Sequence, residues 1–171
     1  MEPSSSAALV LDFANTVDIE DATDAFGTPA GLASWLRERG LPEDAPLADM
    51  LVLREGLRAR LLIANGGPAD EEAIAAAEEL LSRAPVTVRL GGEPEPAAPL
   101  GASGAVGALA AAWALTVASG DWARLKQCPD HRCGWVFWDA TRSRTRRWCT
   151  MRVCGNRAKV RAYAARRNEG E

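Results

Sequence analysis

Four cysteines near the end of the chain constrain its fold more than any other feature of the sequence. Cys128, Cys133, Cys149 and Cys154 are its only cysteines, and they are spaced C-x4-C-x15-C-x4-C. A structural zinc ion takes four soft ligands in a tetrahedron, which two close cysteine pairs supply. The pattern predicts one Zn²⁺ bound by four thiolates, with unrelated buried thiols or two disulfides as alternatives. His131, inside the first pair, is expected to be an exposed turn residue or a nearby donor rather than a ligand.

The segment between the two cysteine pairs supports a metal-organised module. GWVFWDA (134–140) is predicted to form a strand, with Trp135 and Phe137 on one face and Val136 and Trp138 on the other. A unit this small buries too little apolar surface to fold alone, so zinc is expected to supply much of its folding free energy.

Charge is divided unevenly along the chain. Residues 1–121 contain 7 basic and 19 acidic residues, a net charge of −12, whereas residues 122–171 contain 13 basic and 4 acidic residues, a net charge of +9. This asymmetry predicts two domains, 1–121 and 122–171, of which the second has a polyanionic partner. Two or three cations are enough to offset the charge of four thiolates on Zn²⁺, so the remaining basic residues need another explanation.

Two basic segments are candidates for contact with nucleic acid. In TRSRTRRW (141–148) arginines alternate, so an extended chain would point three of them toward a phosphate backbone. After the last cysteine, a helix is predicted with a stripe of alanines and cations along both edges. A solvated helix that packs on the zinc unit is the alternative. The candidate contacts are Arg142, Arg144, Arg146, Arg147, Arg157, Lys159, Arg161 and Arg166.

The junction between the last cysteine and this helix also carries expectations. Gly155 is expected to make a tight turn after the last ligand. Asn156 is then expected to cap the final helix.

Residues 1–121 are predicted to be mainly helical. The helix signals include Thr28 with Pro29 at a start and Gly40 at a stop, and Ser103 as the cap of an alanine-rich helix that ends at Gly120. Val106, Leu109, Ala110, Trp113 and Val117 have core spacing in that last helix. Residues 86–90 alternate as a strand does, and the Gly- and Pro-rich residues 91–103 are expected to be a loop at the tip of a hairpin.

The motif LVLDFANTVD near the start places three polar side chains in an apolar segment. Asp12, Asn15 and Thr16 have helical i, i+3, i+4 spacing, although Leu9 to Phe13 could also begin as a strand. We favour a buried hydrogen-bond network over contact with a ligand. A ligand site at these three residues remains the alternative.

These features together predict an α+β fold that is mainly α. A helical N-terminal domain with a small β element precedes a Cys₄ zinc finger made of a short β-hairpin and a C-terminal helix. The chain has no strongly apolar run and no basic leader, so we expect a cytoplasmic protein without a membrane partner. It also lacks a nucleophile elbow, a phosphate-binding glycine loop and paired catalytic carboxylates, so we expect no enzymatic activity.

The segment CPDHRCGWVFWDATRSRTRRWCTMRVCGNRAKVRAYAARR resembles the CGNR zinc finger of bacterial proteins, named for the motif at residues 154–157. LVLDFANTVD and the helices after it resemble the ABATE domain that usually precedes this finger. The family is described as stress-induced transcription regulators, so the resemblance implies zinc at the four cysteines and DNA as a partner.

Two functions remain open at this stage. One is a zinc-dependent DNA-binding regulator whose N-terminal domain senses a small-molecule effector or forms a homodimer. The other is an interaction or small-molecule-binding protein in which zinc is only a structural staple. Redox sensing through the thiolates is a third hypothesis.

Overall fold

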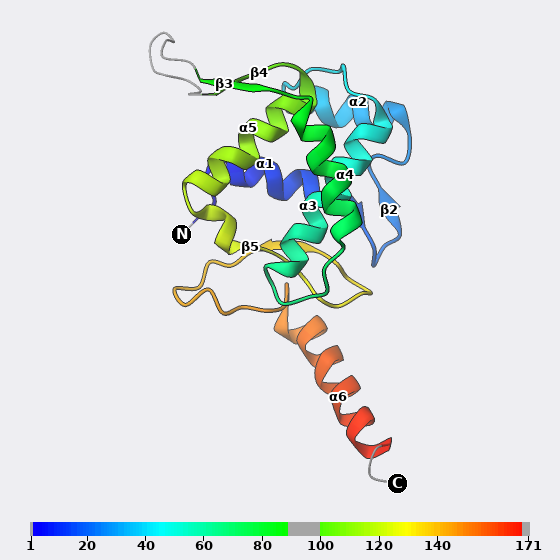
Figure 1. The fold of residues 1–171 in the computed structure, drawn as a ribbon. Helices are drawn as coiled ribbons and strands as arrows, with labels where there is room; N and C mark the ends of the chain where they lie inside the picture. Colours follow the sequence, from blue (N-terminus) through cyan, green and yellow to red (C-terminus); the bar gives the residue numbers. More distant parts are fainter. Residues whose placement is uncertain (1, 89–99, 169–171) are drawn as a thin grey trace.

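The computed structural model describes residues 2–88 and 100–168, and helices dominate both ranges (Figure 1). Five helices form the body: α1 (Ser5–Ala14), α2 (Pro29–Glu38), α3 (Leu47–Ile63), α4 (Glu71–Ser82) and α5 (Gly104–Ala118). Three antiparallel strand pairs accompany them: β1 (Val17–Asp18) with β2 (Thr23–Asp24), β3 (Val86–Val88) with β4 (Leu100–Ala102), and β5 (Leu125–Gln127) with β6 (Val136–Trp138). The last segments are two short helical turns, η1 (Asp121–Arg124) and η2 (Met151–Gly155), and α6 (Asn156–Asn168). The predicted mainly helical α+β class is confirmed.

Local signals account for several helix boundaries. Thr28 Oγ1 accepts a hydrogen bond from Gly31 N at 3.1 Å, Pro29 occupies the first turn, and Gly40 has a φ of +62° after the helix ends. These contacts satisfy main-chain groups that a helix leaves open at its ends. Leu9 to Phe13 of the N-terminal motif lie in α1, so the alternative of a strand there is wrong, whereas Val17–Asp18 at its end form β1.

The start of α5 differs from the sequence expectation. Ser103 stands at the cap position, but its side chain makes no capping bond. Asp44 replaces it, because its Oδ1 accepts a hydrogen bond from Ala105 N at 3.0 Å. Val117, predicted to face the core from the same helix, is 44% exposed.

The small β element of the body is a hairpin. Val86, Thr87 and Val88 pair with Ala102, Gly101 and Leu100. The predicted loop 91–103 is therefore wrong at residues 100–102, which form a strand because the main chain there completes the pairing of β3. Residues 89–99, which include the end of the predicted strand and most of the loop, lie outside the described residues.

The body and the hairpin β5–β6 share apolar core. Inside the body, Phe13 packs against Phe26 and Trp35, with ring centroids 5.9 and 5.7 Å away. A second cluster crosses from α1, α3 and α5 to Leu125 and Val136, both fully buried. The hairpin that leads into the cysteines is thus anchored in the body by its inner face.

Helix α6 projects away from the rest of the molecule, ending far from the body (Figure 1). Its described side chains from Lys159 to Arg167 are all exposed, including those of Val160 and Tyr163. Among the residues that the structure describes, no helix combines the length and apolarity needed to cross a bilayer.

Candidate metal centre and nucleic-acid interface

The four cysteines come from three segments that the fold brings together. Cys128 follows β5 directly, and its main-chain N–H donates to Trp135 O at 2.9 Å. Cys133 precedes β6, and its N–H donates to Asp130 O at 2.8 Å, which closes a tight turn between the first two cysteines. Cys149 lies in the loop after β6, and Cys154 lies in η2. The first pair is therefore held by strand pairing and the second by a helical turn.

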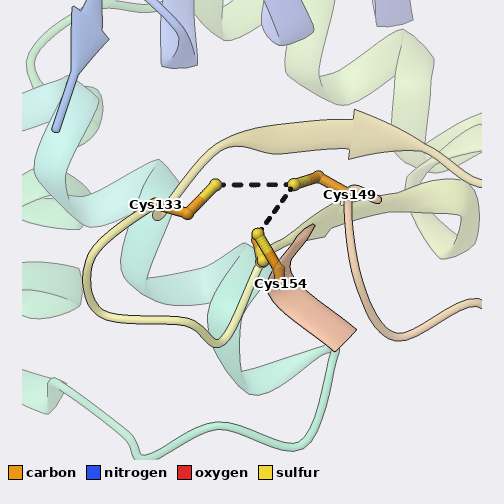
Figure 2. Close-up of side chains that lie close together, drawn as sticks. Cys133, Cys149 and Cys154 are labelled. Carbon is orange, nitrogen blue, oxygen red and sulfur yellow. Dashed lines mark hydrogen bonds between the residues drawn. The ribbon is translucent and has the colours of Figure 1, made fainter. Parts of the chain in front are cut away.

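The sulfur atoms form a compact group. All four lie within 4.8 Å of one another, and Cys149 Sγ is 3.4 Å from Cys133 Sγ and 3.5 Å from Cys154 Sγ. Figure 2 shows these three side chains turned toward one another. A tetrahedral Zn²⁺ with bonds of about 2.3 Å requires sulfurs about 3.8 Å apart. The arrangement therefore has the size and donor set of a single structural zinc site.

The protonation of the thiols supports this fit. Burial, together with the neighbouring sulfurs, raises the pKa of the Cys149 thiol far above its usual value, and burial raises the pKa of Cys154 to about 12. Protein atoms alone would thus leave these thiols neutral at pH 7. A divalent cation reverses this preference because it stabilises the thiolates. One Zn²⁺, held by Cys128, Cys133, Cys149 and Cys154, would supply this charge and crosslink the three segments.

The turn that carries the last cysteine differs from the sequence expectation. Gly155 has no positive φ and continues η2 into α6. A Cβ at Gly155 would stand 2.3 Å from Met151 Sδ, so a larger residue there would displace the exposed Met151 side chain. Thr150 Oγ1 provides the cap by accepting from Val153 N, whereas Asn156 Nδ2 donates back to Arg152 O at 2.9 Å. The predicted tight turn and Asn156 cap are wrong, because the helical path begins before Cys154.

A buried carboxylate organises the arginine-rich loop after β6. Asp139 is fully buried, and its Oδ2 accepts from Lys126 Nζ at 2.8 Å and from Arg146 N at 2.9 Å. Burial by itself would raise the pKa of Asp139, but hydrogen bonds from Lys126, Thr141 and Arg146 lower it to about 2. The carboxylate is thus charged at neutral pH and bends the loop around itself.

The arginines of this loop do not form an extended row. Arg144 has a φ of +53°, which breaks the alternation, although Arg142 and Arg144 remain exposed. Arg146 turns back: its Nε donates to Trp148 O at 2.9 Å and its guanidinium lies 4.8 Å from the Phe137 ring centroid. Arg147 stacks on Trp148. All four arginines of the loop stay exposed, but Arg146 is bonded back to its own loop rather than free.

The cations of α6 fall into two groups. Near its start, Arg157 pairs with Glu20 of the body and, at 3.6 Å, with the buried Asp130, which also lies 3.3 Å from Arg161. These pairs fasten the first turns of α6. Lys159 and Arg166, together with Arg167, which sequence reasoning missed, are exposed and form none of the ion pairs found among the described residues.

Two residues of the N-terminal polar motif make hydrogen bonds inside the protein, just after α1 ends. Asn15 Nδ2 donates to Val136 O, and Val136 N donates to Asn15 Oδ1, both at 2.8 Å. The Asn15 amide thus pairs with β6 as another strand would. Thr16 Oγ1 accepts from the buried Arg54 at 3.1 Å, so these two residues belong to the hydrogen-bond network that we favoured. Asp12 instead pairs with Arg39 at the surface.

Sequence reasoning missed a second bridge between the body and the cysteines. Arg58 is only 3% exposed, its Nη1 donates to Ala14 O at 2.7 Å, and its Nη2 donates to Gly134 O at 2.9 Å. Burial lowers the pKa of Arg58 from its usual value. The available signal was an arginine between Leu57 and Leu61 on the buried side of a helix, because such a charge needs partners in the core.

Several concavities among the described residues border the finger. A cleft of about 740 Å³ separates α1 from the finger, and among its walls are Asp12, Asn15 and Trp135. A second pocket, of about 600 Å³, lies at the base of α6. It includes Arg132 and Arg152, which the sequence analysis did not name among the nucleic-acid contacts.

The metal centre and the helices before it define a zinc-finger protein with a helical N-terminal body. Residues 124–167 match the CGNR zinc finger, as the sequence resemblance implies. Residues 7–121 match the ABATE family, described as "Putative stress-induced transcription regulator". This second match spans more than half of the chain, which therefore belongs to the ABATE family. A search of curated proteins finds no match.

Proposed function

We propose that the zinc-loaded protein binds duplex DNA and regulates transcription. Residues 122–171 form the DNA-binding domain, and residues 1–121 sense an effector or mediate self-association. The protein acts by binding rather than by catalysis, because four thiolates leave zinc no open position for a reacting group.

Helix α6 is the observation that carries the proposal. A helix of 13 residues is about 20 Å long, and the major groove of DNA is wide enough to admit it. It carries Lys159 and Arg161 in its first half and Arg166 and Arg167 near its end, with no acidic side chain from 156 to 167. Ala158, Ala162 and Ala165 give one side a low profile that suits close approach.

The exposure of α6 also favours a partner. An isolated helix of this length is marginally stable in water, and tertiary packing fixes only its first turns. Contact with a polyanion would offset the repulsion among its cations and stabilise the far half. The acidic body repels the same polyanion, so DNA is expected to approach from the α6 side.

Binding to random-sequence duplex DNA, measured by fluorescence polarisation at several salt concentrations, tests the proposal. About five to eight phosphate contacts give a log–log slope between about −5 and −7. Zinc-chelated protein serves as the control and is expected to lose binding. Absence of salt-sensitive binding by the zinc-loaded protein to any duplex would rule the proposal out.

The 740 Å³ cleft favours a second candidate, a small-molecule-binding protein in which zinc is a staple. Residues of α1 and of the finger line this cleft, so a ligand in it would contact both. A metabolite that raises the melting temperature of the wild type but not of Trp135→Ala would support this function. Trp122→Ala, which changes a tryptophan that does not line the cleft, is the control.

A further inference from the structure

The 600 Å³ pocket at the base of α6 is built by three segments of the finger. His131 and Arg132 come from the turn between the first two cysteines, Arg152 and Val153 from η2, and the remaining wall from α6. The α6 residues are Asn156, Arg157, Val160 and Arg161. Four guanidinium groups thus surround one concavity, and no acidic residue lines it.

The charges of the pocket are only partly compensated. Arg157 is paired with Glu20 and Asp130, and Arg161 is paired with Asp130. Arg132 and Arg152 are exposed and take part in no ion pair among the described residues. Two unpaired guanidinium groups beside one pocket favour an anion that offers several oxygens, as a phosphate group does.

Apolar contacts add a second element of recognition. Val153 and Val160 line the same pocket and are 41% and 68% exposed. A sugar ring attached to a phosphate would cover such side chains, whereas an inorganic anion would leave them in water. From this combination we infer that the pocket seats the sugar–phosphate backbone of a nucleic acid strand, with the phosphate at Arg132 and Arg152.

Arg132 and Arg152, the two arginines without an ion pair among the described residues, lie next to cysteines of the zinc site. Arg132 directly precedes Cys133, and Arg152 lies two residues before Cys154. Metal binding therefore fixes both, while Asp130 fastens the opposite wall on α6 through Arg157 and Arg161. A strand held here would set the depth of α6 in the groove without reading bases, since phosphate contacts fix position and carry no sequence information.

The inference rests on the proposed DNA binding, and the double variant R132A/R152A tests it in the zinc-loaded full chain. Loss of the one phosphate that both arginines hold is expected to weaken binding by about 10-fold near 0.1 M salt and to make the salt slope shallower by about 1, equally for unrelated duplexes. R37A/R83A is the matched control, because it removes two exposed arginines from the body. It is expected to change the slope far less.

The outcomes separate the pocket from the function. If the wild type binds DNA and R132A/R152A has the same affinity and salt slope as R37A/R83A, the pocket does not hold the nucleic acid backbone, although the proposed DNA binding is retained. Titration of the wild type with inorganic pyrophosphate, followed by NMR, distinguishes the two sources of phosphate. If pyrophosphate shifts the signals of Arg132 and Arg152 but no duplex binds, the pocket serves a free phosphate, and both the backbone seat and the proposed function are overturned.

Discussion

The body and the finger are stabilised by different means. The body has a continuous core of aromatic and aliphatic side chains from α1 to α5. The finger has a small core of its own, made of three buried cysteines and Phe137 of β6. Apolar burial therefore holds the first region together, whereas the second depends on its metal. The same chain thus contains one part that folds by exclusion of water and one that folds by coordination.

Removal of zinc is expected to have the largest effect on this contrast. Zinc contributes about 10 kcal/mol or more to folding in small fingers, so chelation or Cys154→Ser should abolish the amide NMR signals of the finger. The signals of α2 and α4, far from the metal, should persist. Val153→Ser changes a neighbour that is not a ligand and should retain zinc. Unchanged finger signals after chelation would contradict the contrast.

Phe13→Ala tests the apolar core of the body. Phe13 is fully buried between Phe26 and Trp35, so the variant should lose about 3–5 kcal/mol in the free energy of unfolding. Urea denaturation measures this loss. Val117→Ala, at an exposed site of α5, should cost less than about 0.5 kcal/mol. Equal losses in the two variants would show that the aromatic cluster is not the main support of the body.

Asn15→Ala tests the connection between the two regions. It leaves two main-chain groups of Val136 without partners, at about 1–3 kcal/mol each, so a loss of about 2–6 kcal/mol is expected. Amide hydrogen exchange at Val136 should accelerate. Asn156→Ala removes only an exposed hydrogen bond and is the control. Slow exchange at Val136 in Asn15→Ala would mean that β6 does not need the body.

The titration of Asp139 in the wild type tests the electrostatic part of the contrast. The pKa of Asp139 is about 2 in the folded protein and near 3.8 in a free side chain, so the charged form contributes about 2 kcal/mol. Because the folded pKa is the lower one, this contribution is complete above about pH 4 and is lost as the pH falls through about 2. NMR titration of the Asp139 carboxyl carbon in the wild type measures the midpoint. A midpoint near 3.8 would refute the assignment.

Tyr163→Ala should have the smallest effect on stability. Tyr163 is 58% exposed on α6, so its loss should change the free energy of unfolding by less than about 0.5 kcal/mol. Thermal denaturation of the variant and the wild type measures this change. The affinity of this variant for DNA should nevertheless fall, because Tyr163 is an exposed side chain of α6, the helix that we propose to enter the groove. A large loss of stability would show that α6 packs on the protein rather than projecting from it.

The sequence predicts the structure correctly where the signal lies within one short segment. The cysteine spacing identifies the four sulfurs that the fold gathers, and the Thr28 cap marks the start of α2. It fails where partners are distant: Asn15 and Val136 are 121 positions apart, and Arg58 and Gly134 are 76 apart. The arginine loop was misread for a related reason, since the buried Asp139 and Lys126 bend it and neither lies within the basic run.

The amide of Asn15 has a consequence for how this finger can be reused. Many zinc modules act as cassettes that can be joined in tandem or transplanted, because each completes its own sheet. Here one edge of the finger's hairpin is completed by a side chain from the opposite end of the polypeptide. A graft of residues 122–171 onto a foreign carrier would therefore lose its orientation unless the carrier supplied an equivalent amide, and changes at position 15 and in β6 must be made together.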